Sequence, residues 1–102
     1  MPRTRHEPDP GTIAFEDLGE ALGVEATVVM EYVELGLVHP CQQATSRTLT
    51  AADVARVSRA LRLAREFDVH AAAAAMLVEL LEERDALRRR VAYLEQVAGT
   101  PA

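Results

Sequence analysis

The hydrophobic positions of the chain recur at helical spacing, in segments that glycines separate. The first segment places its apolar residues on one side of a short helix: Phe15, Leu18, Ala21 and Leu22. Gly23 follows in the position where a glycine commonly ends a helix. A second helix, from about Glu25 to Leu35 and ended by Gly36, is predicted to bury Val28, Val29, Tyr32 and Val33. Two short helices joined at Gly23 predict a helix-turn-helix unit.

The next segment has strand and turn signals before a third helix. Leu37 to Pro40 and Arg47 to Leu49 are short extended candidates on either side of the polar loop CQQATS, so they predict a small hairpin, or wing. Thr50 and Asp53 have the spacing of a capping box, with Asp in place of the more usual Glu. A helix is therefore expected to begin there, to run to about Phe67 and to face inward with Val54, Val57, Leu61 and Ala64.

The residues after Asp68 predict one long helix, because no Gly or Pro occurs before Gly99 and an alanine run gives high helix propensity. Its apolar residues alternate at spacings of three and four, the pattern of a coiled coil, with one polar interruption: Leu77, Leu80, Arg84, Leu87, Val91, Leu94 and Ala98. This stripe is too long to fold back on a small head, so we expect it to pair with a second subunit. The alternative is that the last two turns fray while only Leu77 to Leu87 packs locally.

These elements predict a mainly α fold: a helix-turn-helix head with a small hairpin wing, followed by a long C-terminal coiled-coil helix. The expected divisions are a flexible tail at 1–12, rich in Pro and charge, the head at 13–69, the long helix for dimerisation at 70–98 and a short tail at 99–102. Two roles stay open for Arg84 within the stripe. It either sets the helix pairing or extends to solvent at the edge.

The residue types present argue against catalysis and export. No nucleophile elbow and no glycine-rich phosphate loop occur, and His6, His39 and His70 lack the spacing of metal ligands. We therefore expect a protein that is not an enzyme and uses no cofactor or metal.

The chain has one cysteine, Cys41, no signal-peptide run and no apolar stretch near the roughly 20 residues of a membrane span, so we expect a cytoplasmic protein without a membrane partner.

Acidic residues are concentrated in the predicted helix-turn-helix. The whole chain carries a net charge of -5, and residues 15–40 hold no Lys or Arg but six acids: Glu16, Asp17, Glu20, Glu25, Glu31 and Glu34. Carboxylates on a recognition helix would repel DNA phosphates, so nucleic acid is not the expected partner. The six acids form either an ordinary solvated face or a surface for a basic protein.

The third helix carries the opposite signal, with four arginines three residues apart: Arg56, Arg59, Arg62 and Arg65. A spacing of three drifts around a helix, so these side chains spread over a wide face and do not form one phosphate clamp. We interpret them mainly as solvated, or as partners of acids such as Glu66 and Asp68. They keep a DNA-binding alternative open.

Two stretches carry a family resemblance. EDLGEALGVEATVVMEYVELGLVHP resembles the start of the MerR-type winged-helix family, and RTLTAADVARVSRALRLAREFDV continues through its third helix. MerR-type regulators usually have an Arg and a Tyr in the second helix, where this chain has Met30 and Glu31. The closer resemblance is to the chaperone modulator CbpM family, also MerR-like, in ELGLVHP and in SRALRLAREFDVHAAAAAMLVELLEERDALRRRVAYLEQ. It extends over nearly all of Phe15 to Gln96.

The resemblance implies a non-catalytic homodimer that binds the J-domain of a CbpA/DnaJ-type co-chaperone and inhibits its activity. J-domains of that family present a basic second helix beside a His-Pro-Asp turn, which an acidic partner could cover. We hypothesise that the partner-binding residues are the six acids together with apolar residues of the following turn, Leu35 and Leu37. The stripe residues Leu77, Leu80, Arg84, Leu87, Val91 and Leu94 are the expected dimerisation residues.

Two other function classes compete with this hypothesis. One is a MerR-like DNA-binding transcriptional regulator, in which Arg47 of the wing and the arginines of the third helix would contact phosphates. The other is a dimerisation adaptor for an unrelated protein, which would bind neither a J-domain nor DNA.

Overall fold

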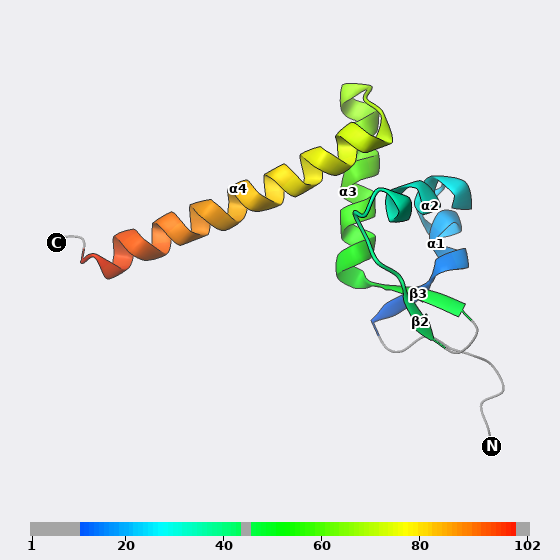
Figure 1. The fold of residues 1–102 in the computed structure, drawn as a ribbon, viewed down its shortest axis with the longest axis horizontal. Coiled ribbons are helices and arrows are strands. Elements are labelled where there is room, and N and C mark those ends of the chain that lie inside the picture. Colours follow the sequence, from blue (N-terminus) through cyan, green and yellow to red (C-terminus); the bar gives the residue numbers. More distant parts are fainter. Residues whose placement is uncertain (1–10, 44–45, 100–102) are drawn as a thin grey trace, which may run out of the picture.

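The computed structural model describes residues 11–43 and 46–99. Most of the predicted N-terminal tail, with His6, lies outside these residues, as do the tip of the hairpin loop and the last three residues. The described elements are β1 (Thr12–Ala14), α1 (Phe15–Leu22), α2 (Ala26–Glu34), β2 (Cys41–Gln43), β3 (Ser46–Thr50), α3 (Ala51–Phe67) and α4 (Ala71–Val97). The predicted mainly α fold with a small wing and a long C-terminal helix is confirmed (Figure 1).

The strands form one antiparallel sheet in the order β1-β3-β2. The predicted hairpin is present, but its first strand is Cys41–Gln43 and not Leu37 to Pro40, so that strand prediction was wrong. Leu37 and Val38 are buried in the core instead, outside the ladder. The third strand, β1, was not predicted; its first residue, Thr12, pairs with Thr50 although it falls in the segment expected to be a tail.

The helix-turn-helix is built on a close approach of backbones at its turn. Gly23 has a φ of 74° and ends α1 in the left-handed conformation, as predicted. The Val24 amide donates to the Gly19 carbonyl at 2.8 Å, which folds the turn back against α1. Gly19 is buried at this crossing, whereas Ala21, predicted to face inward, is exposed on the other side of α1.

The α3 helix begins as the capping-box spacing predicts. The Asp53 amide donates to the Thr50 hydroxyl at 3.1 Å, and this bond satisfies one of the free N–H groups of the first turn. Val57 and Ala60 are fully buried in the core, while three predicted inner residues are half-buried against it: Val54, Leu61 and Ala64. Phe67 ends the helix, as expected.

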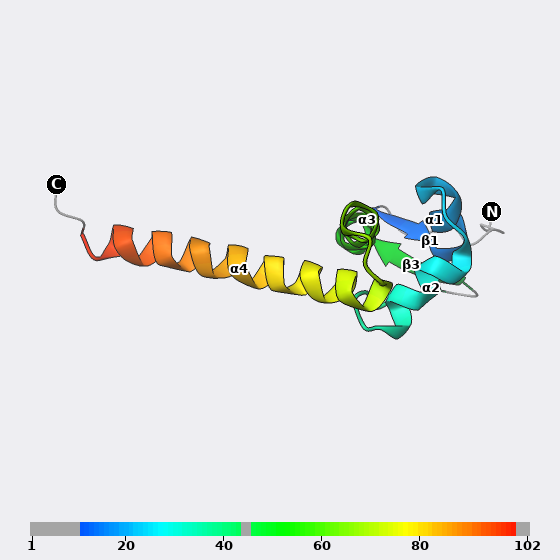
Figure 2. The same ribbon diagram turned by 90° about the horizontal axis from the view of Figure 1, so that it is seen from above.

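The long helix α4 belongs to the head only at its start. Ala74, Ala75 and Val78 are buried against the head, mainly against α3. Beyond them α4 projects away from the head as a single straight arm (Figure 2). The predicted long helix is confirmed, and every residue from 86 to 99 is exposed.

Candidate protein-interaction surfaces

The first helix presents its acids on the side opposite the core. Phe15 and Leu18 are buried beneath α1, whereas Glu16, Asp17 and Glu20 are exposed. Positions three and four residues apart share a side of a helix, so Asp17 and Glu16 each lie beside Glu20 on the outer side of α1. Negative charge in a first helical turn is also favoured by the helix dipole, to which Glu16 and Asp17 contribute here.

The second helix continues this charge. Val29 and Tyr32 are buried, and the opposite side of α2 exposes Thr27, Glu31 and Glu34 at spacings of four and three. Glu25, at the N-cap of α2, is also exposed. We call the set of Glu16, Asp17, Glu20, Glu25, Glu31 and Glu34 the acidic face; all six side chains are accessible, as partner binding would require.

The apolar part of the predicted partner site needs one correction. Leu35 is 41% exposed and remains accessible beside the acidic face. Leu37 is 0% exposed, because the chain turns inward after Gly36 and inserts Leu37 and Val38 into the core. The prediction that Leu37 contacts a partner was therefore wrong, since a fully buried side chain offers no surface.

The predicted dimerisation residues lie on the free side of α4. Leu80, Leu87, Val91 and Leu94 are 49–60% exposed, and they share the side of the helix opposite Ala74, Ala75 and Val78. We call these four residues the apolar stripe. A shallow groove of about 480 Å³ runs along Leu80, Leu87 and Val91 of this stripe. Charged residues also line it: Glu83, Arg84, Arg88 and Glu95. Leu77 is half-buried, and the exposed apolar residue at that end is Met76.

Arg84 lies at the edge of the apolar stripe, with half of its side chain exposed. Its guanidinium pairs with Asp85, the next residue of α4, at 3.1 Å. Arg84 also lines the groove. Both roles predicted for Arg84, setting the helix pairing or extending to solvent at the edge, stay predictions.

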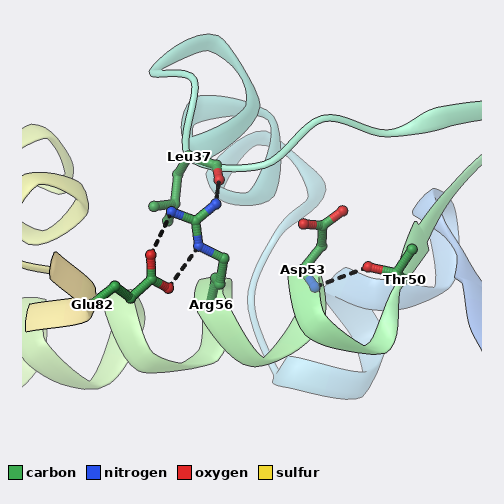
Figure 3. A network of polar contacts seen from close by, with 5 residues as sticks. All are labelled: Leu37, Thr50, Asp53, Arg56 and Glu82. Atoms are coloured by element: carbon green, nitrogen blue, oxygen red, sulfur yellow. Dashed lines mark hydrogen bonds and ion pairs between the residues drawn. The ribbon is translucent and has the colours of Figure 1, made fainter. Parts of the chain in front are cut away.

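Two of the basic side chains needed for DNA contact are occupied within the head. Arg56 pairs with Glu82 of α4 and donates to the Leu37 carbonyl (Figure 3), so it has an acid partner, which is Glu82 and neither of the two acids named as examples, Glu66 and Asp68. Arg47 of the wing stacks on Phe15, with its guanidinium carbon 4.4 Å from the ring centroid. Arg62 and Arg65 are exposed, while Arg59 is half-buried.

The histidines and the cysteine form no metal-binding group in the part of the chain that the structure describes. His39 is exposed, His70 is the N-cap of α4 and Cys41 is exposed on β2. No helix among the described residues is long and apolar enough to cross a bilayer.

Sequence reasoning missed the residues that connect the head to α4. Arg56 and Glu82 are 26 residues apart, and nothing in their spacing indicates that the α3–α4 corner brings them together. Gly19 was also missed, although it stands inside a predicted helix, where glycine lowers stability relative to alanine.

A comparison with protein families supports the helix-turn-helix assignment. The model described as MerR HTH family regulatory protein matches residues 13–96. The match begins within β1 and ends one residue before the end of α4, so it includes the head and the long helix together. A search of curated proteins found no match.

Proposed function

We propose that this chain, which belongs to the MerR family of helix-turn-helix regulatory proteins, is a non-catalytic chaperone modulator. In this proposal it binds the J-domain of a CbpA/DnaJ-type co-chaperone through the acidic face and inhibits the co-chaperone. The resemblance of ELGLVHP and of the α3–α4 sequence to the CbpM family supports the choice of partner.

The observation that carries the proposal is the outer side of α2. In a helix-turn-helix the second helix is the element that enters the major groove of DNA. Here its accessible side presents Thr27, Glu31 and Glu34 and no basic residue. Phosphates would repel this surface, and no bound counterion would be released on contact, whereas a basic protein helix would be attracted to it.

The mechanism that fits this surface is competitive masking. The carboxylates steer a basic J-domain helix into place and pair with its Lys and Arg side chains, mainly increasing the rate of association. Leu35, exposed beside Glu34, supplies apolar area that is desolvated at the contact. A J-domain held in this way cannot present the same basic helix to its Hsp70 partner.

The protein acts as a homodimer in this proposal, and the second copy occupies the apolar stripe. The stripe cannot be covered by its own head, because the head contacts the opposite side of α4. Side chains of both signs flank the groove, with Glu83 and Glu95 alongside Arg84 and Arg88, so an identical helix brings complementary charges to the contact. Pairing removes four half-exposed aliphatic side chains from water.

The second candidate function is DNA binding, which membership of a family of regulatory proteins favours. Exposed Arg62 and Arg65 would have to supply the phosphate contacts, since Arg47 and Arg56 are engaged inside the head. Such binding would weaken steeply with added salt.

The deciding experiment is calorimetric titration of the full chain with the isolated J-domain of a CbpA-type protein from the same cell, at low and high salt. Duplex DNA is titrated in parallel as the competing ligand. We expect saturable J-domain binding near one per subunit, weakened by salt, and no heat from DNA. Absence of J-domain binding together with saturable DNA binding would replace the proposal by the second candidate, and silence toward both would indicate an adaptor.

A further inference from the structure

One arginine connects three segments of the molecule. The Arg56 guanidinium, on α3, donates through Nε and Nη2 to the two carboxylate oxygens of Glu82, both at 2.9 Å. Its remaining amino group donates to the Leu37 carbonyl, in the turn that follows α2 (Figure 3). A single side chain therefore joins the helix-turn-helix, α3 and α4 with three charge-assisted hydrogen bonds.

Glu82 lies where α4 leaves the head. It continues the head-facing side of the helix, four residues after Val78, which is fully buried. After Glu82 only Asp85 is half-buried, and from Ala86 onward every described residue is exposed. The Arg56–Glu82 pair thus lies at the end of the part of α4 that is buried against the head, followed only by half-buried Asp85.

The packing before this point gives α4 little directional constraint. The side chains that α4 buries fully are Ala74, Ala75 and Val78, and its larger residues Leu77 and Leu81 are only half-buried. The crossing angle of two helices is fixed by side chains that interlock as ridges and grooves, and methyl groups provide shallow ridges. A bidentate pair with a third bond to the backbone has a much narrower geometry.

We propose that Arg56 is the positioning residue that sets the direction in which α4 leaves the head. Because α4 acts as a lever beyond Glu82, a swing of about 10° there moves Gln96 by roughly 4 Å, as 14 residues of helix span about 21 Å. In a dimer formed through the apolar stripe, the same bond sets the separation of the two acidic faces. The assignment itself depends on neither the J-domain nor the dimer.

The proposed role of Arg56 can be tested by measuring the distance between two spin labels within one protomer. One label is placed on the native Cys41, exposed on β2, and the other on Gln96→Cys, which is exposed and off the apolar stripe. Labelled chain is diluted into excess unlabelled chain, so that each assembly carries one labelled copy. We expect a narrow distance distribution for the parent and a distribution wider by several ångströms in Arg56→Lys and in Glu82→Gln.

Matched variants separate positioning from general effects. Arg62→Lys makes the same change at an exposed arginine of α3, and Asp85→Asn removes the Arg84–Asp85 pair, which lies within α4; both should keep the narrow distribution. Thermal unfolding of each variant confirms that the head is folded. If Arg56→Lys and Glu82→Gln keep the parent's narrow distribution while folded, alanine packing alone directs α4 and the assignment is wrong. If the parent does not bind a J-domain, the measured label distances still test the role of Arg56.

Discussion

At Gly19, two backbone segments approach so closely that no side chain fits between them. A Cβ atom built there would lie 2.8 Å from the Val24 carbonyl oxygen and 3.3 Å from the Ala26 amide nitrogen. Both are backbone atoms, which cannot rotate out of the way as the end of a side chain can. The turn that aims α2, and with it Glu31 and Glu34, therefore depends on the absence of a methyl group at residue 19.

We predict that Gly19→Ala lowers the stability of the fold by about 1–3 kcal/mol, the usual cost of overpacking. Intrinsic propensity acts in the other direction, since Ala in a helix is favoured over Gly by roughly 0.5–1 kcal/mol. The sign of the change in thermal unfolding at a fixed protein concentration decides which effect dominates. Ala21→Gly, on the exposed side of the same helix, is the control in which propensity alone should act. A more stable Gly19→Ala variant would contradict the packing argument.

Tyr32 gives the head a dependence on alkaline pH. Its ring is 1% exposed, and burial, followed by the charge of Glu31, raises the pKa of the phenol above its ordinary value of 10.0. Above that pH the unfolded chain releases a proton that the folded chain retains, so stability falls as pH rises through 10 toward the folded pKa. The chain has eleven arginines and no lysine, so no lysine titrates in the same range.

Tyr32→Phe keeps the ring and removes the titrating group, so we predict a smaller loss of unfolding free energy between about pH 9 and 11 than in the parent. Urea unfolding across this range measures the difference. Tyr93→Phe removes a tyrosine whose ring is exposed on α4 and serves as the control. Equal pH profiles for the parent and Tyr32→Phe would show that some other group controls alkaline unfolding.

At the scale of elements, the sequence predicts what local signals determine. Gly23 and Gly36 end their helices, and the Thr50 cap begins α3. The absence of Pro and Gly between Asp68 and Gly99 predicts the length of α4. The strands were harder because pairing is non-local. β1 has three residues and pairs with β3, almost forty positions later in the chain. The apolar residues Leu37 and Val38 looked like strand residues in the sequence, but they are buried in the core outside the sheet.

In the candidate site, too, local spacing predicts some residues, while others depend on contacts between distant segments. The acidic face could be found from sequence, because spacing in a short amphipathic helix determines which side is outside. Leu37 could not be assigned, since the turn after Gly36 decides whether it faces solvent or core. Arg56 looked like one member of a regular arginine series, and only the return of α4 past α3 gives it a carboxylate partner.

The acidic face itself yields a prediction at α2. Glu31→Arg together with Glu34→Arg should weaken J-domain binding at least tenfold, or about 1.4 kcal/mol, and reduce its dependence on salt. Calorimetry at two salt concentrations measures both effects. Glu66→Arg with Glu79→Arg changes the net charge equally at exposed positions on α3 and α4, and it should bind nearly as the parent does. Equal weakening in both pairs would mean that overall charge, and not the acidic face, attracts the partner.

At the scale of the whole molecule, α4 uses two opposite sides for two purposes. Ala74, Ala75 and Val78 attach it to its own head, while the apolar stripe faces away from that head over the length of the arm. Because the sides do not overlap, a second copy could bind the stripe without displacing any contact inside the protomer. The helix-turn-helix lies at the other end of the molecule, so pairing also leaves the acidic face free (Figure 1).

If two copies pair through the apolar stripe as proposed, this separation predicts that a stripe variant loses pairing while α4 stays helical and attached to its head. Leu87→Asp places a carboxylate in the middle of the apolar stripe, where pairing would have to desolvate it, so sedimentation should show monomers at concentrations where the parent is dimeric. Ala86→Asp adds the same charge one position away, on an exposed side of α4 outside the stripe, and should remain dimeric. Helix content near the parent's would show that the Leu87→Asp head is still folded. If both variants sediment as the parent does, the second copy does not bind the apolar stripe, and the four leucine and valine side chains must be covered by another partner.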